Sequence, residues 1–323
     1  TAKSHGGAVY INGAGTGSVA PVFEHCLFSG NRSTTANGGA IYRSGGSWLE
    51  RPNDILDCTF ERNYAKRIGG AIYLADSERS DTIQINHCNF NNNKSDLNTD
   101  AVSIGRLRTA RSHLYVRNCH FEGHHWNGVL QMDQPLSGGN LDLKVDSCVF
   151  FKNDQHSGMA GGSLIYITSI SGASYLTVTN CSIDSCDINA FVMFEMIEDE
   201  GSYTMIDKLI ATNGKCSFGI RSESDSKISN VAFISNKIGN MITLGHGDKV
   251  SLVNSLFLQN DVIRFGMGGN FPSTVANSNF INNRLEGWSI PSPAPKVYNC
   301  LFSGNIYSPS ETPAATIFSF YPD

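Results

Sequence analysis

Charged side chains are scarce in this sequence of 323 residues. Asp, Glu, Lys and Arg together make up 16% of it, against about 25% in an average globular protein. The formal net charge is −5, so overall charge gives no reason to expect a nucleic-acid partner. No run of 18 apolar residues occurs, and we therefore expect no membrane-spanning helix. Hydrophobic residues still reach 40%, which excludes a disordered chain.

Motifs for metal, cofactor and targeting are missing as well. No Cys-x-x-Cys pair occurs, so a zinc ribbon is not indicated, and we expect neither a metal ion nor a cofactor. The sequence starts at Thr1 without a signal-like segment. We expect a processed protein or an excerpt from a longer one.

The sequence is rich in glycine and asparagine, with 32 and 30 residues, and it is built on an internal repeat. Gly38-Gly39-Ala40-Ile41-Tyr42 recurs at Gly69 to Tyr73, with relatives at Gly6 to Tyr10 and Gly161 to Tyr166. A second motif, polar-Cys-x-Phe-x-x-Asn, occurs in eleven copies, of which seven hold the Cys. Its copies begin at His25, Asp57, His87, Asn118, Ser147, Asn180, Asp207, Asn230, Asn254, Asn277 and Asn299. Ile183 and Ile210 replace the Phe, and His124 and Cys186 replace the Asn.

This repeat predicts an all-β fold, a single-stranded parallel β-helix of about eleven coils. Each period holds short β-like segments and no helical periodicity. Cys and Phe lie two residues apart, so both side chains face inward from one strand. The Asn falls where the chain turns, because asparagine tolerates left-handed backbone angles and its amide can bond along the axis. Coils stacked about 4.8 Å apart give roughly 50 Å of length, and a right-handed sense is expected for parallel crossovers.

Equivalent residues should stack into three ladders. They are Cys26, Cys58, Cys88, Cys119, Cys148, Cys181 and Cys300 for the thiols; Phe28, Phe60, Phe90, Phe121 and Phe150 for the rings; and Asn31, Asn63, Asn93 and Asn153 for the amides. Buried cysteine acts there as a small apolar residue. Cys186 and Cys216 lie outside the thiol ladder and could form a disulfide between adjacent coils. Lys208 falls in a Cys slot, where an unpaired lysine would be costly, so we expect a register shift at that copy.

We expect residues 1–323 to form one continuous β-helix, because the repeat phase is kept throughout. The coils of residues 1–203 carry long loops, and those of residues 204–323 are lean. The additional residues fall mostly between the Gly-Gly-Ala-Ile-Tyr strand and the next pre-Cys strand, and such insertions often mark a binding face. The expected ligand-binding residues are Trp48, Arg106, Arg108, Arg111, His125 and Trp126.

Catalytic and modification motifs are weak. Asn98-Thr99-Asp100 and Gly245-His246-Gly247 look like fragments of a polygalacturonase signature, but about five coils separate them and no Asp-Asp pair exists. The acidic loops around Glu195–Glu200 and Asp76–Asp81 could serve a lyase but are more typical of a solvated face. We therefore assign no catalytic residue. The Asn-x-Ser sequons Asn31, Asn93 and Asn180 are possible glycosylation sites.

Phe28-Ser29-Gly30-Asn31 followed by Gly38-Gly39-Ala40-Ile41 resembles the repeats of chlamydial polymorphic membrane proteins and of similar microbial surface proteins. The Phe-x-x-Asn part covers almost the whole chain, whereas Gly-Gly-Ala is clear in the first three coils only. The resemblance implies an extracellular or cell-surface β-helix used for adhesion, which binds a cell-surface protein or glycan. Its motifs are architectural, so no functional residue transfers with them.

Three functions therefore stay open. The first is a non-catalytic adhesion or structural module that binds through the loop face of the early coils. The second is a polysaccharide lyase or hydrolase. The third is a filament-building subunit, whose coil ends would join further subunits or the rest of a longer chain.

Overall fold

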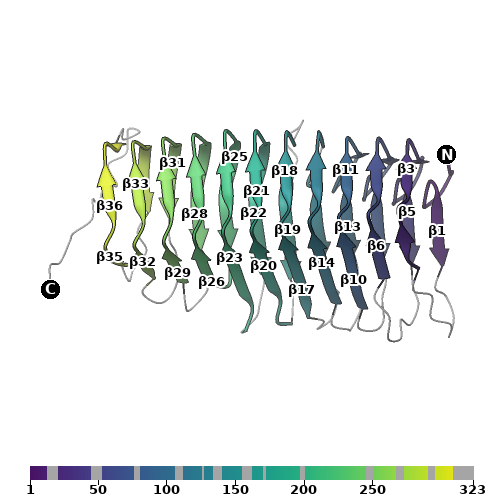
Figure 1. Cartoon of the computed structure of the whole chain (residues 1–323), viewed down its shortest axis with the longest axis horizontal. Coiled ribbons are helices and arrows are strands. Elements are labelled where there is room, and N and C mark those ends of the chain that lie inside the picture. Colours follow the sequence, from purple (N-terminus) through teal and green to yellow (C-terminus); the bar gives the residue numbers. More distant parts are fainter. Residues whose placement is uncertain are drawn as a thin grey trace.

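The chain forms an elongated parallel β-solenoid, with its first and last coils at opposite ends (Figure 1). The structure is a computed structural model. It describes residues 1–12, 21–44, 53–75, 81–105, 112–125, 127–133, 140–154, 162–169, 172–196, 201–244, 250–266, 273–289 and 295–307. Every regular element in these ranges is a β-strand. The predicted fold class, an all-β parallel β-helix of about eleven coils, is confirmed, while its handedness stays a prediction.

Three long parallel sheets run along the solenoid, and one short sheet joins them in the first coils. Sheet A has 12 strands: β1 (Val9–Asn12), β5 (Ile41–Ser44), β9 (Ile72–Ala75), β13 (Val102–Gly105), β16 (Leu130–Asp133), β19 (Ser163–Ser169), β22 (Asp187–Met196), β25 (Lys215–Ser222), β28 (Lys237–Leu244), β31 (Asp261–Gly266), β34 (Arg284–Ser289) and β37 (Ile306–Tyr307). Sheet B has 11 strands: β2 (Phe23–Glu24), β6 (Asn53–Leu56), β10 (Asp81–Asn86), β14 (Ser112–Arg117), β17 (Leu141–Asp146), β20 (Tyr175–Thr179), β23 (Tyr203–Asp207), β26 (Asp225–Ser229), β29 (Val250–Val253), β32 (Thr274–Ala276) and β35 (Lys296–Tyr298).

Sheet C also has 11 strands: β3 (Leu27–Ser29), β7 (Thr59–Glu61), β11 (Asn89–Asn91), β15 (His120–Glu122), β18 (Val149–Phe151), β21 (Ser182–Asp184), β24 (Ile210–Thr212), β27 (Ala232–Ile234), β30 (Leu256–Leu258), β33 (Asn279–Ile281) and β36 (Leu301–Ser303). Sheet D has three strands: β4 (Arg32–Ser33), β8 (Tyr64–Ala65) and β12 (Lys94–Ser95). Each coil is numbered here by its sheet C strand, so that β3 belongs to coil 1 and β36 to coil 11.

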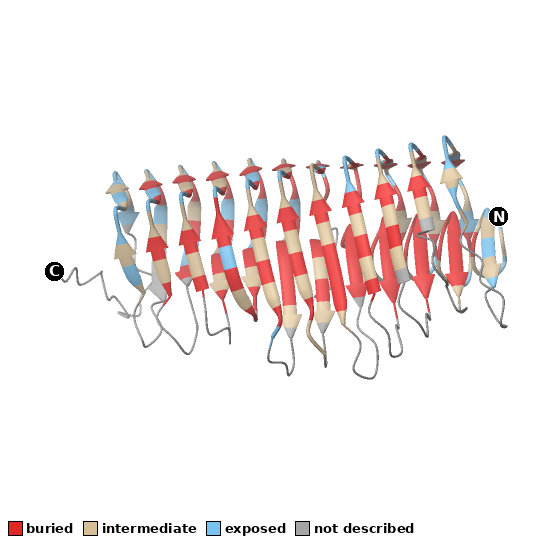
Figure 2. Cartoon of the chain, turned by 60° about the horizontal axis from the view of Figure 1, so that its bottom comes forward, coloured by how far each residue is buried: buried red, intermediate tan, exposed pale blue. Residues whose placement is uncertain are grey.

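Alternation along the strands builds the core. In β14 the residues alternate between buried and half-exposed up to an exposed Arg117, and the same pattern recurs in neighbouring coils (Figure 2). The strand register is fixed by the repeat, with Phe60 paired to Phe28 and to Phe90 in sheet C. Cys58 and Phe60 are both fully buried, which confirms that the Cys-x-Phe pair faces inward. A single apolar column therefore fills the solenoid.

Stacked phenylalanines form much of that column. Ring centroids of consecutive coils lie 4.8 Å apart for Phe28 and Phe60 and 5.1 Å apart for Phe121 and Phe150, with the rings nearly parallel. This spacing allows offset stacking along the whole run. The column resumes at Phe233 and continues through Phe257, Phe280 and Phe302.

The repeat motif is out of register with the structure by one residue in coil 7. Ala211, and not Ile210, pairs with Ile183 and Phe233 in sheet C. Ile210 is 48% exposed. The small Ala211 leaves room that the buried Phe191 ring of β22 fills, and this ring lies 6.3 Å from that of Phe233.

The same shift explains Lys208. The lysine occupies an outer turn with φ 54 rather than a buried slot, and Leu209 takes the thiol position in the core. The expected register shift at this copy is confirmed, and no buried lysine has to be accommodated.

Two positions in every coil adopt left-handed backbone angles, and coils 1 to 3 add a third at Gly38, Gly69 and Thr99. The first is the residue before the thiol slot, such as His25 or Asp57, and the second is the residue before the amide slot, such as Gly30 or Arg62. The prediction that asparagine would itself take the left-handed angle at the amide slot is therefore wrong. The left-handed residue comes one position earlier, which frees the asparagine amide to bond across coils.

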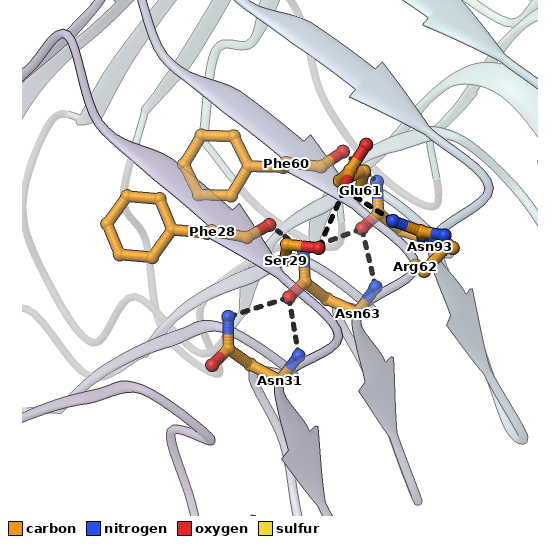
Figure 3. Close-up of polar contacts among 8 residues, drawn as sticks. All are labelled: Phe28, Ser29, Asn31, Phe60, Glu61, Arg62, Asn63 and Asn93. Atoms are coloured by element: carbon orange, nitrogen blue, oxygen red, sulfur yellow. Dashed lines mark hydrogen bonds and ion pairs between the residues drawn. The ribbon is translucent and has the colours of Figure 1, made fainter.

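The amide ladder is confirmed (Figure 3). The Oδ1 atom of Asn63 accepts hydrogen bonds from the backbone N–H of Asn31 at 3.0 Å and from its Nδ2 at 2.9 Å. The Nδ2 of Asn63 donates to the Phe28 carbonyl and to Asn93 Oδ1, both at 2.9 Å. Each asparagine thus bonds the backbone and the side-chain amide of the preceding coil and donates to the side-chain amide of the next one. Polar groups buried away from water need such partners within the protein.

All nine cysteines are free thiols. The disulfide considered between Cys186 and Cys216 is absent, because Cys216 pairs with Ile188 in sheet A and so lies two residues out of step with Cys186. Cys186 instead occupies the amide slot of coil 6, where its Sγ lies 3.6 Å from the Phe150 carbonyl. Cys186 Sγ also accepts a hydrogen bond from Asn153 Nδ2 at 3.8 Å, so the thiol takes over one donated and one accepted bond of a ladder asparagine.

Candidate functional site

The first coils have a different cross-section from the later ones. In coils 1 to 3, five or six residues lie between the amide slot and the Gly-Gly-Ala position, and they form the strands of sheet D. From coil 6 onward the sheet A strand starts directly after the amide slot, as β22 does at Asp187 and β28 at Lys237. Sheet D is therefore an additional face confined to the early coils.

The Gly-Gly-Ala motif returns the chain from this face to sheet A. Gly38 has φ +69, a left-handed angle that most residues avoid. A Cβ on Gly39 would stand 1.9 Å from the Gly70 carbonyl oxygen of the next coil, so no side chain fits there. The two glycines are thus required by the turn and by the close approach of adjacent coils.

Coil 3 closes the same turn with Thr99 and Asp100 in place of the glycines. Asp100 is fully buried, and its carboxylate accepts hydrogen bonds from the Ser95 backbone N–H at 2.7 Å and from the Asn127 backbone N–H at 2.9 Å. The Asn98-Thr99-Asp100 motif therefore stabilises a turn. His246, in the other suspected fragment, lies outside the described residues.

Sheet D carries a group of cations on its outer face. Arg32, Tyr64 and Lys94 lie in register on β4, β8 and β12, and the Arg32 guanidinium stands 4.8 Å from the centre of the Tyr64 ring. Lys66 forms an ion pair with Asp96 at 2.8 Å. Burial would raise the pKa of Asp96, but hydrogen bonds from Lys66 and Tyr64 outweigh it and hold that pKa below its usual value.

The sequence-predicted binding residues are only partly described. Trp48, Arg106, Arg108, Arg111 and Trp126 lie outside the described residues. Most of each long loop, including Asp76, Glu78 and Glu198–Glu200, also falls outside them. His125 is exposed in the position that follows the amide slot, and its Nδ1 lies 2.7 Å from Asp154 Oδ1.

The histidine group does not converge. His120 points outward, with its Nε2 at 3.2 Å from Glu122 Oε2. His124 is fully buried in the amide slot of coil 4, where its Nδ1 lies 3.1 Å from the Asn93 carbonyl, and burial lowers the pKa of its imidazole. The neutral ring with its proton on Nδ1 can donate that bond. His124 thus replaces an asparagine of the amide ladder, and His125 is exposed on the outer surface of the solenoid.

The one acidic-loop carboxylate that is described is held in an ion-pair network. Glu195 accepts a hydrogen bond from the Tyr166 hydroxyl at 2.7 Å and pairs with Arg221 at 3.1 Å. Arg221 also reaches Glu223 at 2.8 Å. These contacts tie three successive coils of sheet A together.

Outward aspartates make a second interlocking pattern. Asp184 accepts hydrogen bonds from Thr212 Oγ1 at 2.7 Å and Asn213 Nδ2 at 3.0 Å on the next coil, and these bonds lower its pKa. Asp146 and Asp207 make the equivalent bonds to their neighbours. These carboxylates therefore hold turns on the outside of the solenoid.

Two further features concern ligands and modification. Glu24, His25 and Asp57 have ligand atoms within 4.8 Å of one another and are all exposed, so this trio could hold a metal ion. Among the sequons, Asn93 is buried and its Nδ2 donates to the Phe60 carbonyl at 2.9 Å. Glycosylation of Asn93 is incompatible with the folded coil, whereas Asn180 is exposed.

Comparison with known proteins gives a match in coils 1 and 2, which contain both the ladder residues and strands of sheet D. Residues 25–42 and 57–75 match the Chlamydia polymorphic membrane protein (Chlamydia_PMP) repeat. These two segments are similar to polymorphic membrane protein repeats. Both run from the turn before the thiol slot, through β3–β4 or β7–β8, to β5 or β9. No curated protein and no solved structure matches the chain significantly. Within the described residues, no helix is long and apolar enough to cross a membrane.

The sheet D cations were missed by reasoning from sequence. The available signal was their position, since Arg32 and Lys94 directly follow amide slots of the early coils, and Arg67 lies just before a Gly-Gly-Ala motif. The ladders are found by comparing equivalent positions of successive repeats. The cations occupy several different positions, so this comparison does not show that they form a separate face.

Proposed function

We propose that this chain is a non-catalytic module, exposed at a cell surface or secreted, that acts in adhesion or structural assembly. The observation that carries the proposal is the pair of segments similar to polymorphic membrane protein repeats within an uninterrupted solenoid. We further propose that it binds through the early coils, where both the long loops and sheet D occur. Its partner would be a cell-surface protein or glycan.

The way the coils are built supports this function. Inward residues are used for stacking, amides for turns, and Asp100, Asp184 and Glu195 for contacts between coils or within turns. A rigid rod with a regular surface presents loops at a fixed spacing, which suits contact with an extended or repetitive partner.

An adhesion assay tests the proposal. Beads coated with the purified chain should adhere to cultured cells, and soluble chain should compete. The variant Trp48→Ala with Arg106→Ala and Arg108→Ala should adhere less while its thermal unfolding is unchanged. A matched control is Lys215→Ala with Lys237→Ala, because both lysines are exposed in the lean coils. Coated beads that adhere no better than albumin-coated beads would contradict the adhesion function.

Size-exclusion chromatography of a panel of polysaccharides separates adhesion from catalysis. The proposed module should leave every polymer at its original length, with or without co-elution. A polymer that shortens on incubation with the chain would show instead a lyase or hydrolase, and the acidic loops would be the first place to mutate.

A further inference from the structure

The outer surface of sheet D and its flanking turns is strongly basic in an acidic protein. Residues 1–5, 29–37, 61–68 and 91–98 contain six lysines and arginines, which are Lys3, Arg32, Arg62, Lys66, Arg67 and Lys94. The same segments contain two carboxylates, Glu61 and Asp96. The local excess of four positive charges contrasts with a net charge of −5 for the whole chain, so the rest of the sequence carries −9. A local field of this kind attracts anions to one place.

These cations are arranged in rows along the solenoid axis. Arg32, Tyr64 and Lys94 form one row, one per coil, at the sheet spacing of about 4.8 Å. The next outward position along each strand forms a second row, which consists of Lys3, Thr34, Lys66 and Asp96. The pairings of Ala2 with Ser33, of Ser33 with Ala65 and of Ala65 with Ser95 require this order. Because the backbone of each row is fixed by sheet hydrogen bonds, the two rows present Arg32, Lys94, Lys3 and Lys66 in straight lines, with Asp96 at the end of the second row.

Most of the positive charge is accessible. Lys3, Arg32, Arg62, Lys66 and Arg67 are exposed, and Lys94 is half-buried. The two carboxylates neutralise Arg62 at 2.6 Å and Lys66 at 2.8 Å. Asp100 lies beneath the turn, buried and bonded to backbone N–H groups. Guanidinium and ammonium groups of this kind make strong charge-assisted hydrogen bonds to oxyanions.

We propose that sheet D binds a linear sulfated polysaccharide, which lies along its rows of cations. This inference rests on the proposed adhesion function and names the partner class. Charge complementarity requires a polyanion, and the straight rows on a rigid sheet favour an extended polymer with charges at regular intervals. Leu97, 48% exposed, is the single large apolar residue exposed on the described part of this face. A folded protein partner would need a larger apolar centre.

Binding of the whole chain to heparin tests the proposal. The wild type should bind heparin at physiological salt, and the affinity should fall as salt increases, because the contacts are ionic and exposed. The variant Arg32→Gln with Arg67→Gln and Lys94→Gln should bind about tenfold more weakly, because three ion contacts at about twofold each multiply to roughly that loss. Its urea midpoint should match that of the wild type, which separates lost binding from lost folding.

The matched control uses the continuation of the first row into the lean coils. Lys215, Lys237 and Arg284 occupy the position that follows the amide slot, as Arg32 and Lys94 do, and all three are exposed. The variant Lys215→Gln with Lys237→Gln and Arg284→Gln changes net charge equally and should keep heparin affinity within about twofold. An equal loss in both triple variants would show that net charge, and not sheet D, controls binding, and would overturn the assignment.

Binding of other polymers and of lipid vesicles tests which class of partner sheet D prefers. Unsulfated dextran should not bind, and polyglutamate and phosphatidylserine vesicles should bind more weakly than heparin. Tighter binding of polyglutamate or of the vesicles would overturn the glycan assignment in favour of an acidic protein or a lipid surface. If coated beads adhere to cells but the chain ignores heparin, this inference is wrong and the adhesion function stands. If the chain neither adheres nor binds heparin, both are wrong.

Discussion

Removal of one ladder asparagine should destabilise the early coils severely. Asn63 is 1% exposed, and its side chain makes four hydrogen bonds, to Asn31 N–H, Asn31 Nδ2, the Phe28 carbonyl and Asn93 Oδ1. The variant Asn63→Ala removes all four and leaves the Asn31 amide without its acceptor. At about 1 kcal/mol for each bond, we expect a loss of about 4 kcal/mol in the free energy of unfolding.

The matched control lies on the next sheet C strand. Asn89 precedes Phe90 on β11, is exposed, and points away from the core. The variant Asn89→Ala should change the free energy of unfolding by less than about 0.5 kcal/mol. Because a solenoid can unfold coil by coil, urea denaturation should be followed together with hydrogen exchange of the Asn31 amide.

Hydrogen exchange reports on the ladder directly. The Asn31 N–H donates to Asn63 Oδ1, so its exchange should become at least about tenfold faster in Asn63→Ala and stay unchanged in Asn89→Ala. If Asn63→Ala were within about 1 kcal/mol of the control, and Asn31 kept its protection, the amide ladder would not be a principal source of stability and the energetic account of the repeat would be refuted.

Three further predictions concern the core and the outer turns. At about pH 8, near the usual thiol pKa, the native protein should react with a thiol reagent only at the half-buried Cys26 and Cys300. All nine thiols should react after denaturation. Rapid reaction of more than two thiols in the native state would contradict the burial of the other cysteines in the core. The variant Phe191→Ala should cost about 3–5 kcal/mol, and adding Ala211→Phe should recover part of it, since one ring would again fill the coil 7 core; a double variant no more stable than Phe191→Ala would refute this packing. Hydrogen bonds from the next coil lower the pKa of Asp184, so its stabilising contribution is present above the unfolded pKa of about 3.9 and is lost as the pH falls through the lower folded value. Acidification from about pH 5 to about pH 2.5 should therefore lower the urea midpoint of the wild type more than that of Asp184→Asn, and parallel curves would contradict the assignment.

The repeat predicted the fold well because its ladder residues are set by burial and turn geometry alone. Cys58, Phe60 and Asn63 have the inward positions and the cross-coil bonds that their spacing indicated. The sequence motif failed at coil 7, because Asn213 matches the repeat by residue type while it occupies the left-handed turn position one residue earlier. Only the three-dimensional register shows that Gly214 takes the amide slot, with its N–H donating to Asn236 Oδ1 at 2.9 Å.

The candidate site was harder to predict than the fold. Its residues repeat at no fixed spacing and fill no core, so periodicity does not select them. Arg67 and Lys94 come from different columns, and they share a face only because β4, β8 and β12 turn away from sheet C before the chain enters sheet A. Long loops were an obvious place to look for binding, whereas a short strand with ordinary surface lysines and arginines was not.

The limited extent of the polymorphic membrane protein match has a structural cause. The thiol, ring and amide ladders run through most of the chain, yet the repeat matches residues 25–42 and 57–75 alone. Those segments combine the ladders with the Gly-Gly turn that returns sheet D to sheet A in coils 1 and 2, whereas coil 3 makes the same turn with Thr99 and Asp100 and is not matched. The repeat therefore describes a coil with an additional outer face, and lean coils keep the core without it. If that face binds, as the excess of cations on it suggests, then the coils that resemble the surface-protein repeat are also the coils that make contact, and the lean coils extend the rod that carries them.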